Sequence, residues 1–242
     1  MKKTILFSTL LASVAALASP REDVSSAVEK LKAAPNYSWT SKTEVEGGNF
    51  NMAPISGKVD KTGYAVVSQE RDGNTTIAVV KGEKGLVKTD EGWKTGEELR
   101  AAGGGGGGGQ RGGMRGMALL RSKAPAEDAS TILKGVQELK QADGVVSGEL
   151  SEESAKELAR MGRGGRGGPG GGAGDGPKNA KGSVKFWLKD GQLAKMELKT
   201  SATMNFQGED RAMASTRTVE IKDVGTSTVE VPADAKKKLE QP

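Results

Sequence analysis

The chain has 242 residues, with 36 basic and 31 acidic side chains, and it contains neither cysteine nor histidine. This composition excludes disulfides, thiolate nucleophiles, imidazole bases and Cys/His metal sites. The net charge of +5 is mild, whereas a nucleic-acid-binding protein usually has a larger and clustered basic excess. We therefore expect no metal site, no cofactor and no nucleic-acid partner.

Residues 1–18 have the pattern of a cleavable bacterial export signal. Lys2 and Lys3 give a positive start, residues 5–17 are almost wholly apolar, and residues 16–18 supply the small-x-small step that signal peptidase reads. The apolar run is too short for a spanning helix. We expect cleavage between Ala18 and Ser19. Since Ser19 stands where a lipoprotein has cysteine, we expect a soluble periplasmic or secreted protein.

The rest of the chain, residues 19–242, is expected to form a single domain interrupted by two glycine-rich tracts. These tracts cover residues 101–116 and 161–182, and the first contains seven consecutive glycines. Glycine loses the most backbone entropy on ordering and has no side chain to bury. Both tracts are therefore predicted to be disordered, flexible loops.

The first block begins with a helix and continues as an antiparallel meander. Ser-Pro-Arg-Glu at residues 19–22 is a capping box with proline at the first helical position, and an apolar stripe follows to Ala33. Strands are then expected over residues 37–46, 55–61, 63–71, 75–81 and 85–93. The Asp72-Gly73 pair predicts a tight hairpin between the third and fourth of them.

The second block is expected to be helical, and the third returns to strands. Helices are predicted over residues 114–123, 126–141 and 151–160, with a short strand at residues 145–150. In the third block we expect an Asp190-Gly191 hairpin, a long strand over residues 194–206, strands at 216–224 and 226–231, and a closing helix over 232–239.

Apolar residues at every second position of the third block are candidates for a ligand-lining surface. They are Val184, Phe186, Met196, Leu198, Met204 and Phe206. Flexible thioethers suit a variable apolar guest, so this stripe has the character of a cavity wall. The alternative is that these side chains simply pack on the middle helices.

Two C-terminal segments carry a resemblance to a known family. Residues 182–198, read from Gly182, form an apolar-x-Trp-apolar strand, a turn and a long strand, and residues 229–237 form a strand end followed by proline. With the element order, these segments resemble the LolA/LolB-type periplasmic lipoprotein carriers. The resemblance implies a curved, unclosed antiparallel sheet wrapped on several helices, an α+β fold, and an acyl chain, lipoprotein or other apolar molecule as ligand. The carriers' functional arginine matches no position here.

Arginines in the glycine tracts are the second candidate site. Arg111 and Arg115 lie in the first tract, Arg160 directly precedes the second, and Arg163 and Arg166 lie near its start. Such Arg/Gly segments bind nucleic acid in cytosolic proteins, but the export signal argues against that role. They leave open an alternative function, an envelope interaction protein whose loops bind anionic lipid, glycan or a protein partner. Loops without a partner are the simpler interpretation.

Two further features have simple interpretations. Trp187 falls on the charged side of its strand, which indicates either a contact surface or a ring stacked under a lysine stem. The serine and carboxylates at residues 151–153 are better explained as a helix cap than as a catalytic group, and there is no Gly-x-Ser-x-Gly motif. We therefore do not expect an enzyme.

Overall fold

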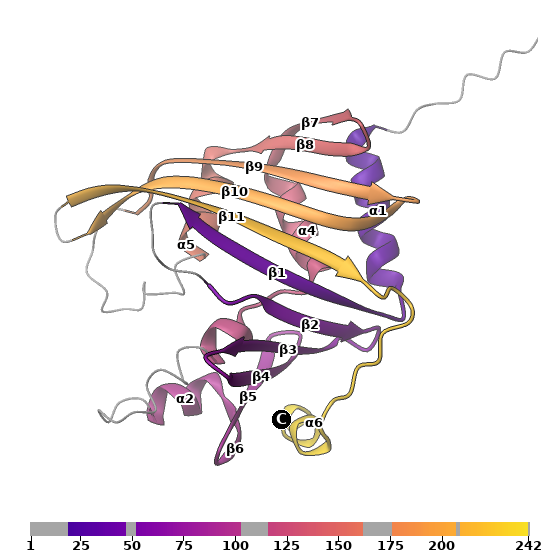
Figure 1. The fold of residues 1–242 in the computed structure, drawn as a ribbon, viewed down its shortest axis with the longest axis vertical. Coiled ribbons are helices and arrows are strands. Elements are labelled where there is room, and N and C mark those ends of the chain that lie inside the picture. Colours follow the sequence, from indigo (N-terminus) through magenta and orange to yellow (C-terminus); the bar gives the residue numbers. More distant parts are fainter. Residues whose placement is uncertain (1–18, 47–51, 103–115, 162–175, 207–208, 242) are drawn as a thin grey trace, which may run out of the picture.

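The computed structural model describes residues 19–46, 52–102, 116–161, 176–206 and 209–241. These residues form one curved, open antiparallel sheet of 11 strands together with helices, which confirms the expected α+β class (Figure 1). The strands are β1 (Asn36–Glu46), β2 (Ile55–Asp60), β3 (Tyr64–Arg71), β4 (Asn74–Lys81), β5 (Lys84–Thr89), β6 (Gly92–Thr95), β7 (Val136–Ala142), β8 (Val145–Leu150), β9 (Lys178–Lys189), β10 (Gln192–Phe206) and β11 (Glu209–Lys222). The helices are α1 (Pro20–Ala33), α2 (Gly96–Ala102), α4 (Pro125–Gly135), α5 (Glu152–Met161) and α6 (Ala233–Leu239).

The sheet consists of two meanders joined at its centre. The strand order is β6-β5-β4-β3-β2-β1-β11-β10-β9-β8-β7, so β1 from the N-terminal half pairs with β11 from the C-terminal half. Trp39 stands opposite Ile221 in this central pair. The two ends of the chain are therefore joined by backbone hydrogen bonds in the middle of one sheet.

Asp-Gly turns connect several neighbouring strands. The turn pairs are Asp72-Gly73, Asp143-Gly144 and Asp190-Gly191, with φ of 51–54° at the aspartates and 68–74° at the glycines. Two consecutive positive φ angles are the type I′ geometry that matches strand twist. The hairpins expected at Asp72 and at Asp190 are confirmed.

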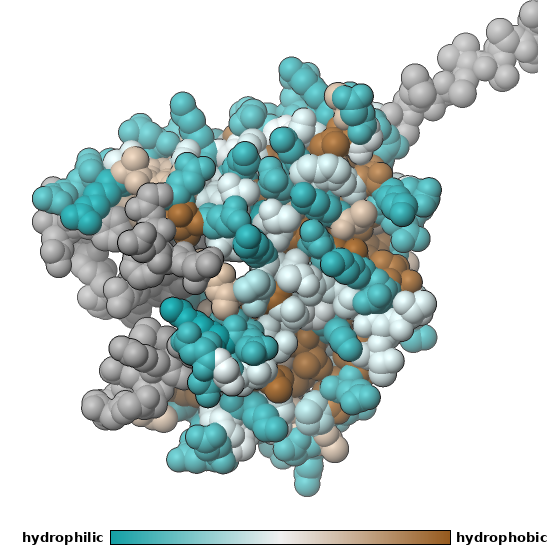
Figure 2. All heavy atoms as spheres, viewed as in Figure 1, coloured by the Kyte–Doolittle hydropathy of each residue, from teal (hydrophilic) through white to brown (hydrophobic). Residues whose placement is uncertain are grey.

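Three helices cover one face of the sheet, which we call the inner face. In Figure 1, α1, α4 and α5 lie behind the strands of the C-terminal half. Buried side chains of these helices and of the inner face form one apolar cluster that extends from Val24 on α1 to Val67 on β3. The opposite face is called the outer face, and in Figure 2 hydrophilic and intermediate residues dominate it.

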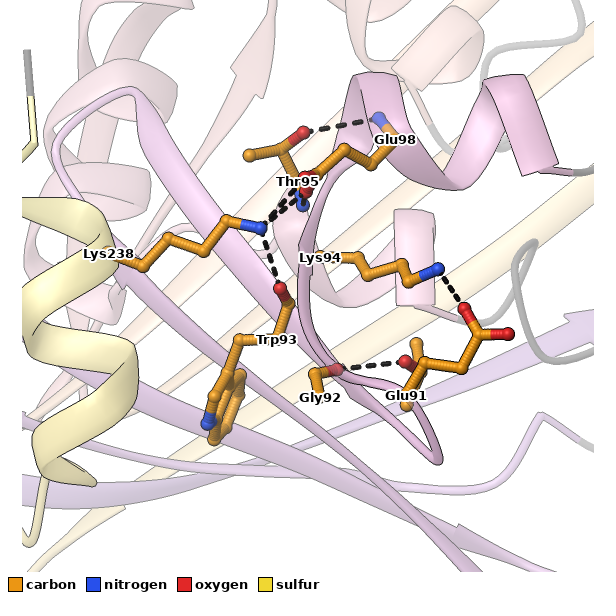
Figure 3. A network of polar contacts seen from close by, with 8 residues as sticks. Glu91, Gly92, Trp93, Lys94, Thr95, Glu98 and Lys238 are labelled. Atoms are coloured by element: carbon orange, nitrogen blue, oxygen red, sulfur yellow. Dashed lines mark hydrogen bonds and ion pairs between the residues drawn. The ribbon is translucent and has the colours of Figure 1, made fainter.

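A smaller apolar cluster lies on the outer face, at the β3–β6 end of the sheet. Tyr64, Val79, Leu86 and Trp93 alternate with inner-face residues and are covered by Ala235 and Leu239 of α6. The Lys238 ammonium of α6 donates to the carbonyl of Trp93 at 2.8 Å and to both oxygens of Glu98 at 2.8 and 2.7 Å (Figure 3). The C-terminal helix is thus fixed to the far end of the sheet.

The N-terminal helix is fixed at both its start and its side. The Ser19 hydroxyl accepts from the backbone N–H of Glu22, and the Glu22 carboxylate accepts from the Ser19 nitrogen, so the predicted capping box is present. Arg21 donates to the carbonyls of Leu133 at 2.9 Å and Val136 at 2.6 Å. These carbonyls lie at the end of α4, where helix carbonyls lack partners within the helix.

The helix expected over residues 126–141 is wrong in its second half. The helix ends at Gly135, and Val136–Ala142 is the edge strand β7. A Cβ at Gly135 would overlap the Ser154 side chain of α5, so this glycine allows the two helix ends to approach closely. The chain then pairs with β8, and backbone pairing with a neighbour overrides the helical pattern of these residues.

Three strand predictions also need correction. The strand expected over residues 85–93 is a hairpin of two strands, β5 and β6, because Asp90 and Glu91 form a turn. Residues 226–231 form no strand and instead cross the outer face toward α6. On β10 the register shifts between Leu193 and Lys195, so Leu193 is buried where the strict alternation predicted Ala194.

The predicted loop boundaries are too wide at both glycine tracts. Helix α2 includes Ala101 and Ala102, and residues 116–120 are helical, within the helix expected at residues 114–123. Strand β9 begins at Lys178, and Ala180 is buried in the main cluster. The tract centres, residues 103–115 and 162–175, lie outside the described residues.

Candidate functional site

The predicted ligand-lining residues whose side chains are described lie on the inner face of β9 and β10. The cross-strand pairs Met196–Phe186 and Leu198–Val184 place four of them in two adjacent rows. Their exposed fractions are 0–1% at Phe186, Val184 and Met196, and 5% at Leu198 and Met204. The side chain of Phe206 lies outside the described part of the chain.

Small and branched helix side chains cover these strands. The covering residues in the same apolar cluster are Val24, Ala27, Val28 and Leu31 of α1, Ala126, Ala129, Ile132 and Leu133 of α4, and Ala155 of α5. A cavity wide enough for water would leave accessible surface on its lining, whereas Phe186 and Met196 have almost none. At these two side chains the helix–sheet interface is therefore closed in this structure.

A partly buried ion pair crosses the interface between α4 and β11. Arg217 Nη2 lies 2.7 Å from Asp128 Oδ2, with side-chain exposures of 31% and 11%. Burial raises the pKa of Asp128 above its usual range, although Arg217 and Lys123 act in the opposite direction. The effect of burial on this carboxylate is therefore larger than the opposing attraction of its cationic neighbours.

Helix α4 has few other polar contacts to the sheet. The Tyr37 hydroxyl of β1 accepts from the backbone N–H of Ala126 at 3.5 Å, a long contact. Burial raises the pKa of Tyr37 to about 12, so this hydroxyl stays neutral. Apart from these contacts, the side of α4 that faces the sheet is held by apolar packing.

A polar pair interrupts the apolar inner face next to the ion pair. Leu198 pairs with Arg217, and the next inward pair along β10 and β11 is Thr200 with Ser215, whose hydroxyls lie 3.0 Å apart. Both of these residues are only partly buried. Ala202 and Met204 of β10 lie beyond this pair and are buried again, so the polar residues form a break within the inner face rather than its end.

Trp187 lies on the outer face of β9, where the Lys195 ammonium stands 4.4 Å from its ring centroid. The indole is half-buried, as its place in the strand suggested. A cation–π contact accounts for the exposed ring without any partner. Its role as a contact surface stays a prediction.

The predicted arginine site is described only at one position. Arg160 is exposed in the last turn of α5, and its guanidinium lies against Gly176 just before β9. Arg111, Arg115, Arg163 and Arg166 lie outside the described residues. The export signal does so as well, including Ala18, while Ser19 is the cap of α1.

Two kinds of feature are absent from the described residues. No group of three or more acidic side chains there is arranged to hold a metal ion. None of the helices in the described ranges is both long enough and apolar enough to cross a membrane.

Sequence reasoning did not identify the Asp128–Arg217 pair. Asp128 lies in the first turn of α4, where the helix dipole alone is enough to explain an acidic residue. The sequence did contain a signal. Asp128 lies three residues before Thr131 and four before the buried Ile132, so it is close to the apolar stripe of the helix. A charge at the margin of a buried stripe requires a partner, but only the β1–β11 pairing brings Arg217 within reach.

The solved structures to which the chain is similar include two that align over almost all of it. The first is the crystal structure of LprF from Mycobacterium bovis, with 13% identity and a TM-score of 0.43 over 90% of this chain and 100% of that one. The second is the LolA superfamily protein NE2245 from Nitrosomonas europaea, with 11% identity and a TM-score of 0.38 over 93% and 99%. No protein-family model matches the sequence, and no curated protein sequence matches it.

Proposed function

We propose that this protein binds an apolar ligand, such as an acyl chain, between the inner face of the sheet and the helices α1 and α4. The observation that carries the proposal is the apolar cluster itself. Phe186, Met196 and Leu198 face helix side chains that are mostly small, and α4 has few polar contacts to the sheet. Such an interface can separate without breaking many hydrogen bonds.

Entry of a guest requires that α4 moves away from β10 and β11. The interface is closed at Phe186 and Met196, so the guest must replace helix side chains as their packing partner. Because the guest is also apolar, this exchange changes the buried apolar area little. The two thioethers, Met196 and Met204, can adjust to guests of different shape.

The Asp128–Arg217 ion pair joins α4 to β11 and must break when α4 moves away. Burial penalises the ionised carboxylate, so the pair holds α4 in place without adding much stability. When α4 moves outward, both charges regain water. We propose that the pair fixes the closed position and that its hydration offsets part of the cost of opening.

The proposal also places residues 19–242 outside the cytoplasm as one domain. The pattern of residues 1–18 supports export, and the β1–β11 pairing supports one domain because it joins both ends of the chain. The protein would then act as a soluble periplasmic or secreted carrier.

Fluorescence quenching tests the site with the protein's own tryptophans. Trp39 is buried in the main apolar cluster, whereas Trp187 lies on the outer face. One variant, Trp93→Phe with Trp187→Phe, retains only Trp39, and the matched control, Trp39→Phe with Trp93→Phe, retains only Trp187. We expect a dibrominated stearate to quench Trp39 strongly and saturably and to leave Trp187 nearly unchanged.

Two results would contradict the carrier proposal. One is equal quenching of both tryptophans, which indicates non-specific association. The other is a Trp39 emission that does not respond, combined with the absence of lipid when the purified protein is extracted and analysed by mass spectrometry. Circular dichroism of both variants checks that they are folded.

A further inference from the structure

A separate hollow lies on the outer face of the sheet, away from the apolar interior. It has a volume of about 500 Å³, which is within the usual range for small-molecule sites. Its lining residues are Ser38, Trp39, Thr40, Ser56, Gly57, Lys58, Val66, Ser68, Thr228 and Glu230. We call this hollow the outer trough.

Strands β1, β2 and β3 form the floor of the outer trough. Ser38 pairs with Lys58 and Thr40 with Ser56, while Ser56 pairs with Ser68, so their side chains share one face. Trp39 and Gly57 alternate with them, and the Trp39 ring lies over Gly57 on the inner face. The floor is therefore a row of short hydroxyl side chains above the back of the apolar cluster.

The chain between β11 and α6 forms the wall. This segment, residues 223–232, leaves the end of β11 and reaches α6 without joining the sheet (Figure 1). The backbone N–H of Gly225 donates to the carbonyl of Asn36 at 2.8 Å, and Val231 packs on the smaller apolar cluster. Since it is held at both ends, the wall is a fixed part of the fold.

The lining of the outer trough has polar groups that no described residue engages. The hydroxyls of Thr40, Ser56, Ser68 and Thr228 form no side-chain hydrogen bond within the described ranges. Lys58 and Glu230 form no ion pair there. The hollow is thus lined by one cation from the sheet and one anion from the wall, and the other polar side chains of its lining are hydroxyls.

Two buried side-chain oxygens close to one end of the wall also lack a hydrogen-bond partner. Asn36 Oδ1 and Ser227 Oγ are buried and have no hydrogen-bond partner in the described structure. Asn36 precedes Ser38 by two residues on the same face of β1, and Ser227 is adjacent to Thr228. Buried polar atoms are usually paired, so these two are exceptions within the described structure, and neither belongs to the lining of the trough.

The chemistry of the lining selects one class of ligand. Hydroxyls both donate and accept, so they match a ligand that is itself rich in hydroxyls. One cation and one anion in the same lining do not favour a phosphate, which requires a cluster of cations. Extended peptides bind at free strand edges, but β1 and β2 are paired on both sides.

We propose that the outer trough binds a short saccharide. Hydroxyls of the sugar would exchange hydrogen bonds with Thr40, Ser56 and Ser68, while Lys58 donates to it and Glu230 accepts from it. Val66 offers a small apolar surface for the C–H face of a ring. This site is independent of the apolar interior, because the sheet separates the two.

NMR titration with two disaccharides tests the proposal on the full mature chain. The neutral probe is N,N′-diacetylchitobiose and the acidic probe is digalacturonate. We expect at least one of them to shift backbone amide signals of β1, β2, β3 and the wall in a saturable way. We expect Lys58→Met or Glu230→Gln to weaken this binding about tenfold, since each removes one charge-assisted hydrogen bond.

Lys185→Met is the matched control, because Lys185 is an exposed lysine on the outer face of β9, outside the trough. It should bind the saccharides like the unmodified protein.

Binding of either saccharide at the trough supports the proposal, and the stronger probe shows whether a carboxylate contributes. Three results overturn it: no saturable shift up to about 20 mM of either disaccharide, shifts centred elsewhere, or unchanged affinity in both trough variants. A tri-alanine peptide that binds where the sugars do not would replace it by a peptide site.

Discussion

Asp128 on α4 and Arg217 on β11 are joined at 2.7 Å across the helix–sheet interface, yet the pKa of Asp128 is raised. Desolvation is the largest cause, followed by the opposing attraction of Arg217 and Lys123. The folded protein therefore favours the neutral form of this carboxyl group more than the unfolded chain does. The pair therefore fixes the position of α4 on the sheet but contributes little to the free energy of unfolding.

The first prediction concerns Asp128→Asn, a neutral isostere. We expect this variant to be no less stable than the unmodified protein at neutral pH, because it removes a penalised buried charge. A carboxyl group with a raised pKa stabilises the fold fully below its unfolded pKa, and this contribution is lost as pH rises through the raised value. Urea unfolding from pH 7 down to pH 4 should therefore show the unmodified protein gaining stability relative to Asp128→Asn.

A loss of about 2 kcal/mol or more for Asp128→Asn at pH 7 would contradict this prediction, since it would mean that Arg217 outweighs desolvation. Glu152→Gln serves as the control. Its ion pair with Lys156 is on the surface of α5, and such pairs contribute about 0.5 kcal/mol or less.

Arg217→Met should have the opposite effect to Asp128→Asn. It leaves the Asp128 carboxylate buried without its nearest cation, and removal of one partner of a buried pair costs about 3–5 kcal/mol. We expect a value nearer 2–3 kcal/mol at neutral pH, because Arg217 is itself 31% exposed. Urea unfolding measures the loss, which should shrink as Asp128 is protonated at low pH. A loss that does not vary with pH would show that Arg217 acts through packing alone.

The third prediction concerns the attachment of α6. Lys238 lowers the pKa of Glu98 to about 2, with the backbone N–H of Thr95 as the next cause (Figure 3). A carboxyl group with a lowered pKa stabilises the fold above its unfolded pKa, and that contribution is lost as pH falls from about 4.5 to about 2. Lys238→Met should therefore release α6, raise its rate of proteolysis several-fold at neutral pH, and remove this acid sensitivity. The control is Lys237→Met, on the exposed side of α6, and the protease should cleave it at the same rate as the unmodified protein.

The parts of the fold that follow from short-range chemistry were predictable. Asp72-Gly73 and Asp190-Gly191 permit the positive φ angles of a tight turn, and Ser19 with Glu22 completes a capping box within one turn. The alternation around Phe186 correctly identified an inner face. Each of these signals needs only neighbours in the sequence.

The errors arose where distant partners decide the outcome. Val136 continues a helical pattern, but its backbone pairs with Leu150 and forms an edge strand. The register shift after Leu193 depends on β9, and Arg217 becomes a partner of Asp128 only through the sheet. For the candidate site, the lining stripe was located correctly in space, while its role as a ligand surface stays a prediction.

Gly57 provides the fourth prediction. A Cβ at this position would overlap the Trp39 ring, which lies directly across the β1–β2 pair. Gly57→Ala should displace the indole and destabilise the fold by about 1–3 kcal/mol, as overpacking does. The measurement is urea unfolding together with the emission maximum of the variant that retains only Trp39. Ser56→Ala, at the neighbouring outer-face position, should change neither quantity.

The final prediction concerns the mature N-terminus. If the export signal is cleaved before Ser19, the nitrogen that lies 2.8 Å from Glu22 Oε2 becomes a charged α-amino group. A cation at a helix N-terminus is unfavourable toward the helix dipole, and the Glu22 carboxylate compensates for it. Hydrogen bonds from Ser19 lower the pKa of Glu22, so the carboxylate is ionised at neutral pH. Glu22→Gln should therefore lower the Tm more in the mature protein than in a form extended by a few residues before Ser19.

Ser19→Ala should cost about 1 kcal/mol in both forms, because the hydroxyl cap does not depend on the terminal charge. Equal effects of Glu22→Gln in the two forms would show that the amino group contributes no more than an ordinary backbone N–H.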